Sequence, residues 1–60
     1  MATVTFEIQD SDAWALAQFV KRVGYSDCLA NAVDKDEAFR MINGLEAVRK
    51  GMGDAGYAPR

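Results

Sequence analysis

The sequence predicts an α+β fold in which one N-terminal strand is followed by two helices. Residues 3–9, TVTFEIQ, alternate apolar and polar side chains, which is the two-residue period of a half-buried strand. Residues 11–23 and 35–51 instead place apolar side chains three and four positions apart, as an amphipathic helix does. Because a lone strand is not stable in water, we expect it to pair within the chain or across a dimer.

The helix predicted over residues 35–51 has clear signals at both ends. Asp34 is placed to act as its N-cap, and Glu37, three residues later, completes a capping box. Gly51 or Gly53 is expected to end the helix, because glycine is the residue that most often follows the last helical turn.

The helix predicted over residues 11–23 begins after Asp10 or Ser11, either of which suits an N-cap, and ends at Gly24. Trp14 lies off its apolar face, so it either closes the edge of the core or forms an exposed aromatic anchor for a partner.

Residues 25–33 connect the two helices and leave fewer signals. Ser26 with Asp27 predicts a short helical turn, and Cys28 is expected to be a small buried hydrophobic residue. In the following helix, Gly44 interrupts the apolar stripe. It either allows two helices to approach closely or offers a flat surface to a partner's backbone.

The apolar positions of these elements predict the core of a single small domain over residues 1–60. A chain of 60 residues buries only a small core, so each large apolar side chain matters. The predicted core is Val4, Phe6, Ile8, Leu16, Val20, Leu29, Met41, Ile42 and Leu45.

The composition argues against catalysis and against any cofactor. The chain has no histidine and one cysteine, which leaves no disulfide framework, no Cys–His pair and no zinc site. Neither a phosphate-binding glycine loop nor an EF-hand spacing is present. No secretory signal and no membrane span are expected, and the lone cysteine fits a reducing cytosol. The expectation is a non-enzymatic protein without cofactor or metal.

Charge is distributed unevenly along the chain, whose net charge is −2. The first 37 residues hold seven acids and three bases, and the acids gather where the second long helix begins. A carboxylate cluster of this kind attracts a protein partner with a basic surface, or it is only a solvated face. The predicted partner-binding residues are Asp27, Asp34, Asp36, Glu37 and Trp14. Asp27 and Asp36 are expected to be the carboxylates not used as caps.

The order strand, helix, helix resembles the ribbon-helix-helix repressors, and VGYSDCLANAV resembles their turn and second-helix start. The resemblance implies a dimer whose strand enters the DNA major groove through Thr3, Thr5, Glu7 and Gln9. This face lacks basic residues, so the repressor is kept as the alternative function and no direct nucleic-acid binding is expected.

A second resemblance is one of protein type. The runs GYSDCLANAVD and AGYAPR, in a small acidic chain without catalytic parts, resemble the anti-CRISPR proteins of phages and mobile elements. The resemblance implies an inhibitor that blocks the DNA-binding surface of a type I CRISPR interference complex. That inhibitor would act in the cytoplasm of a bacterial host cell as a monomer or homodimer. This is the preferred function from the sequence, and the resemblance assigns no site residue.

Overall fold

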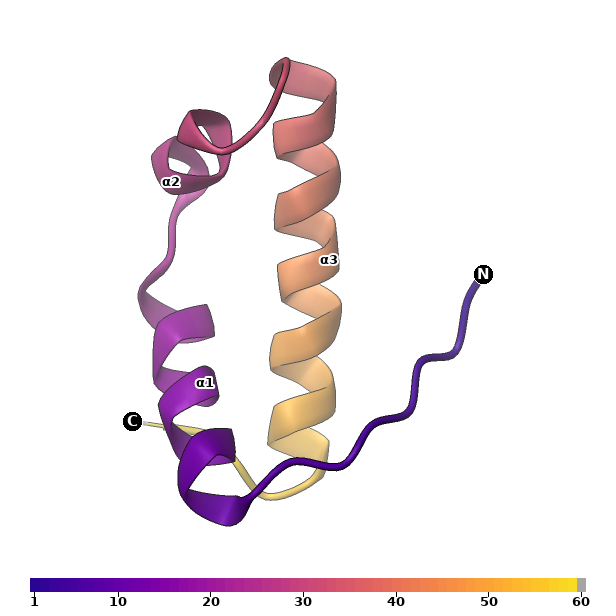
Figure 1. Ribbon diagram of the computed structural model, residues 1–60, viewed down its shortest axis with the longest axis vertical. Helices are drawn as coiled ribbons and strands as arrows, with labels where there is room; N and C mark the ends of the chain where they lie inside the picture. Colours follow the sequence, from indigo (N-terminus) through magenta and orange to yellow (C-terminus); the bar gives the residue numbers. More distant parts are fainter. Residues whose placement is uncertain (60) are drawn as a thin grey trace.

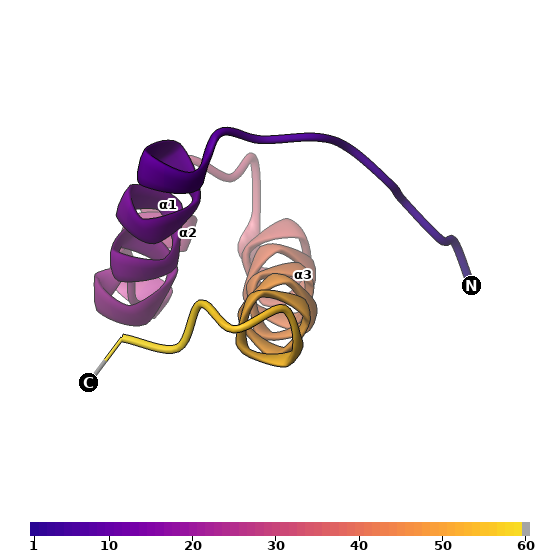
Figure 2. The same cartoon turned by 90° about the horizontal axis from the view of Figure 1, so that it is seen from below.

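The computed structural model describes residues 1–59, and this part of the chain is entirely helical (Figure 1). It contains α1 (Asp10–Arg22), α2 (Tyr25–Ala30) and α3 (Lys35–Asp54). The long α3 packs against both other helices, which follow one another along one of its sides (Figure 1). Seen from below, α1 and α2 form one row beside α3 (Figure 2). The result is a thin molecule of 33 × 26 × 16 Å.

The predicted strand is wrong, and with it the α+β fold class, because no strand occurs in residues 1–59. Residues 1–9, here called the N-terminal arm, run away from the helices on one side of the molecule (Figures 1 and 2). Their alternation is real, but the described chain offers no second strand, and a single strand has no hydrogen-bonding partner. Val4, Phe6 and Ile8 therefore remain 77%, 60% and 40% exposed.

Helix α1 begins at Asp10 and is preceded by Gln9, whose carbonyl accepts a bond from the Ala13 N–H at 2.8 Å. The predicted side-chain cap at Asp10 or Ser11 is wrong, because both residues lie inside the first turn. Carboxylates in that turn still oppose the positive end of the helix dipole, and basic residues occupy the last turn.

The predicted helical turn in the connection is confirmed as α2, and the predicted cap of α3 is confirmed at Asp34. The Asp34 carboxylate accepts a hydrogen bond from the Glu37 N–H at 2.9 Å. The Glu37 carboxylate accepts one from the Val33 N–H at 3.0 Å, one residue before the cap. The first bond satisfies one of the backbone donors that a helix start leaves without partners, and the second ties the residue before the cap to the helix in place of the predicted capping-box bond to the Asp34 N–H.

Helix α3 ends later than predicted. Gly51 and Gly53 lie within it, and the terminating residue is Gly56, whose φ is 99°. The Tyr57 N–H donates to the Met52 carbonyl at 2.8 Å, and the Gly56 N–H donates to the Gly53 carbonyl at 3.0 Å. This pair of bonds is the Schellman arrangement, in which a left-handed glycine turns the chain out of the helix.

The core is smaller than the sequence predicted. Small side chains make up most of it, which lets the helices approach closely but buries little apolar surface. Of the predicted core only Val20 is buried, Leu16, Met41, Ile42 and Leu45 are half-buried, and Leu29 and the three arm residues are exposed. The buried residues are Ala13, Ala17, Val20, Cys28, Ala38 and Met52. The prediction for Cys28 is thus confirmed.

Candidate functional site

The acidic residues predicted to bind a partner are mostly engaged with their own backbone. Besides the two bonds of Asp34 and Glu37 described above, the Asp27 carboxylate accepts a hydrogen bond from the Gly24 N–H at 2.9 Å. The expectation that Asp27 is not used as a cap is therefore wrong. Only Asp36 among the four has no hydrogen bond to another described residue. Helix capping accounts for most of this cluster.

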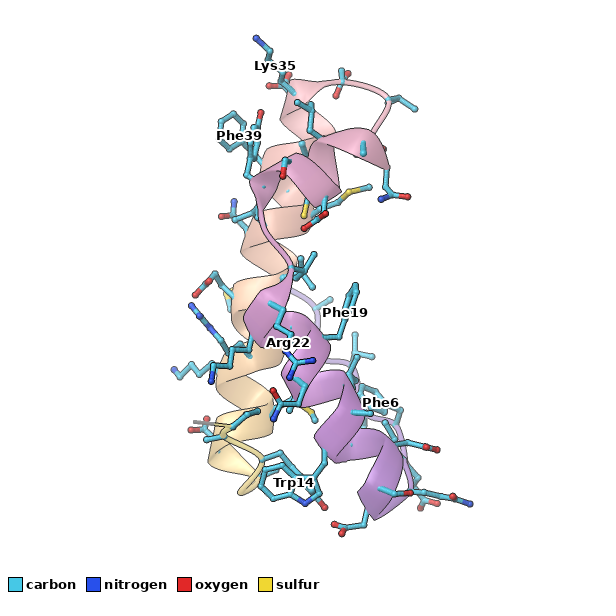
Figure 3. All side chains as sticks on the ribbon, turned by 90° about the vertical axis from the view of Figure 1, so that its left-hand side faces the viewer. Phe6, Trp14, Phe19, Arg22, Lys35 and Phe39 are labelled. Atoms are coloured by element: carbon cyan, nitrogen blue, oxygen red, sulfur yellow. The ribbon has the colours of Figure 1, made fainter. Side chains whose placement is uncertain are left out.

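Trp14 lies far from the predicted acidic residues. The start of α3, marked by Lys35, and Trp14 are at opposite ends of the molecule (Figure 3). Trp14 is 43% exposed and packs edge-to-face against Tyr57, with ring centroids 5.0 Å apart and planes at 70°. The predicted partner-binding residues therefore do not form one surface.

The Trp14–Tyr57 contact joins the C-terminal tail to the start of α1. The Tyr57 hydroxyl donates a hydrogen bond to the Asp10 carboxylate. This bond, together with partial loss of water and the Asp10 negative charge, raises the pKa of the Tyr57 phenol above its ordinary value of 10.0. Tyr57 also packs against the cluster of Ala13, Ala17 and Met52. These contacts hold the C-terminal tail against the start of α1, so we assign them a structural role.

One hollow of the molecule is an apolar groove between α3 and the row formed by α1 and α2. Its volume is about 710 Å³. Phe19 of α1 and Val23, which directly follows α1, border it on one side together with Cys28 of α2, and Leu45 and Val48 of α3 border it on the other. Its size is that of a site for a small ligand or for a few side chains of another protein.

A second apolar hollow, of about 630 Å³, lies between the N-terminal arm and α3. Gly44 and Val48 line both hollows, so the two are continuous across the middle of α3. Figure 3 shows Phe6 and Phe19 on the same side of the molecule. We call this surface the arm-side face, and its members are Val4, Phe6, Ile8, Phe19, Gly44 and Val48.

The opposite side of the molecule carries a different aromatic pair. Phe39, which is 57% exposed, projects away from the arm-side face (Figure 3). Its ring lies 5.2 Å from that of Tyr25, tilted by 35°. Because each ring covers part of the other, this pair leaves less unpartnered apolar surface than the arm-side face does.

No cluster of three or more potential metal ligands exists in residues 1–59. Within the same residues, none of the helices has both the length and the apolar character needed to cross a membrane.

A family model matches the sequence over residues 1–60, which is the whole chain. The chain belongs to the family of unknown function DUF7706. No curated protein and no solved structure matches it.

For this DUF7706 chain, sequence reasoning found the helices but missed the arm-side face. Phe6 and Ile8 were placed in the core because their alternation predicted a paired strand. Two features of the sequence point to uncovered apolar surface. One is the missing partner of the predicted strand, and the other is Gly44 in the middle of α3, for which a flat contact surface was one of the two interpretations given above. Taken together, they indicate apolar surface that the chain cannot cover by itself.

Proposed function

We propose that this protein acts by binding another protein chain through its arm-side face, without catalysis. The observation that supports the proposal is the continuous apolar surface formed by the arm, the end of α1 and the middle of α3. Phe6 and Phe19 on this surface are 60% and 58% exposed, and apolar patches of this kind mark interaction sites. Exposed aromatic side chains bordering hollows are the usual anchors of such contacts.

The acidic residues play a secondary part in this proposal. Their carboxylates are largely occupied as helix caps, so the contact on the arm-side face does not depend on them, and any long-range steering by these acids would concern a further, basic partner. Inhibition of a type I CRISPR interference complex, in the cytoplasm of a bacterial host, stays a prediction about which protein is bound. The alternative function, a ribbon-helix-helix repressor, requires a strand that enters the DNA groove, and residues 1–59 contain no strand.

Photo-crosslinking in the cells that encode the protein tests the proposal. A benzophenone amino acid replaces Phe19 on the arm-side face, Phe39 on the opposite side, or Asp36 in the acidic cluster. We expect a discrete protein adduct from position 19 and little from position 39, which has nearly the same exposure. No adduct from position 19 would contradict the proposal. An adduct from position 36 alone would return the contact to the acidic cluster.

A further inference from the structure

We infer that the occupant of the arm-side face is a second copy of this chain, packed face to face about a twofold axis. The inference rests on the proposed function and specifies its partner. It assigns the arm-side face as the interface of a homodimer, in which each copy supplies the cover that the other lacks.

The surface area of the single chain carries this inference. A folded monomer of 6.6 kDa exposes about 3,900 Å² according to the size scaling of compact proteins. This chain exposes 4956 Å², an excess of about 1,100 Å². A standard protein interface buries about 800 Å² on each partner. The excess therefore matches the area that one copy contributes to a stable dimer.

The shape of the chain leads to the same conclusion. A compact chain of 60 residues has a radius of gyration of about 10 Å, whereas the value here is 12.2 Å. The extended arm and the open groove account for this expansion. Both border the arm-side face, so one occupant covers the two together.

The small size of the core favours a second copy of this chain, and not an unrelated protein, as the occupant of the arm-side face. No large side chain in residues 1–59 is fully buried, and three of the six buried residues are alanines. Chains this small commonly add oligomerisation to such a core. An occupant that adds to the stability of so small a core is most effective when it is present wherever the chain is made. A second copy meets that condition without any other gene product.

The arm-side face is also complementary to itself. It combines protruding rings at Phe6 and Phe19 with hollows on either side of α3. In a twofold interface the same patch meets itself, so a ridge of one copy enters the hollow of the other. The surface at Gly44 is open, because a Cβ placed there meets nothing within 4 Å beyond its own helix turn, so the backbone of another copy can come close.

Charge supports the same arrangement. Among the described residues that line the two hollows, only Arg22 and Asp27 are charged, and they have opposite signs. Two identical faces can thus meet without burying a pair of like charges at their centre. Depletion of charge at the centre is typical of homodimer interfaces.

Sedimentation equilibrium of purified protein, with two matched variants, tests the inference. Wild type is expected to be a dimer of twice 6.6 kDa at about 100 µM. Phe19→Glu buries a charge in the interface and should raise the dimer dissociation constant at least about tenfold. Phe39 is 57% exposed and Phe19 is 58% exposed, so Phe39→Glu is the matched control. It should change the dimer dissociation constant by less than about threefold. Circular dichroism checks that both variants are folded.

A measurement on wild type alone covers the case in which Phe19→Glu does not fold. On dilution from dimer to monomer, the methyl NMR signals of Val4, Ile8 and Val48 should shift. That of Val33, which lines neither hollow and is 85% exposed, should not. A strictly monomeric wild type, a larger assembly, or shifts confined to Val33 would overturn the inference. A monomer that still gives the position-19 adduct with another protein would leave the proposed function intact.

Discussion

At the scale of single residues, this chain uses its carboxylates mainly to hold backbone in place. Asp27, Asp34 and Glu37 each accept a bond from a backbone N–H at or just before a helix start. Such bonds fix the short α2 and the start of α3, next to the buried side chains of Cys28 and Ala38. The acidic character of the chain is thus partly a consequence of how its helices begin.

Replacing the cap of α3 should be more costly than replacing its free neighbour. Asp34→Ala removes the acceptor for the Glu37 N–H and should lower the free energy of unfolding by about 1 kcal/mol. Asp36→Ala removes only a dipole interaction, which the better helix propensity of alanine roughly offsets. Urea unfolding followed by circular dichroism measures both. Equal losses for the two variants would contradict the capping role.

Tyr57 gives a prediction for pH. Its raised pKa means that the folded chain favours the neutral phenol. The resulting stabilisation is complete below about pH 10, the unfolded pKa, and disappears as pH rises through the higher folded value. In a Tyr25→Phe background, absorbance at 295 nm should show Tyr57 ionising above pH 10. Asp10→Asn should lower that pKa, and an unchanged titration would argue against the Asp10 bond.

At the scale of secondary-structure elements, helix signals were more informative than the strand signal. The spacing of apolar residues located α1 to within one residue at each end and most of α3, because a helix satisfies its own backbone hydrogen bonds. The alternation in residues 3–9 could not define a strand, because a strand needs a partner that this sequence does not supply. The end of α3 was missed because three glycines compete for that role.

Those glycines can be separated by alanine substitution. Gly56→Ala forces alanine into a left-handed conformation and should cost about 1 kcal/mol. Gly53→Ala lies within α3, where an added Cβ meets nothing within 4 Å, and should stabilise the protein by about 0.5–1 kcal/mol. Thermal unfolding compares the two. Opposite signs identify Gly56 as the stop, whereas a gain from Gly56→Ala would exclude the Schellman turn.

At the scale of the whole molecule, the sequence predicted a small core and a need for a partner but not the place of contact. The predicted site joined Trp14 to Asp27 on α2 and to three carboxylates at the start of α3, which lies at the other end of the molecule. The arm-side face escaped prediction because its members come from the arm, α1 and α3, and only the fold brings them together. Sequence spacing cannot anticipate which apolar residues remain uncovered when a core is this small.

The central claim is that the arm-side face is covered by a second chain in solution. Phe19 and Phe39 test it directly, because their side chains are 58% and 57% exposed in the single chain and lie on opposite sides. A soluble paramagnetic probe reports by NMR how far solvent reaches each ring in the wild-type protein. At concentrations where the dimer is expected, the Phe19 ring should relax markedly more slowly than the Phe39 ring. Equal relaxation of the two rings would show that the arm-side face is open and would contradict the account.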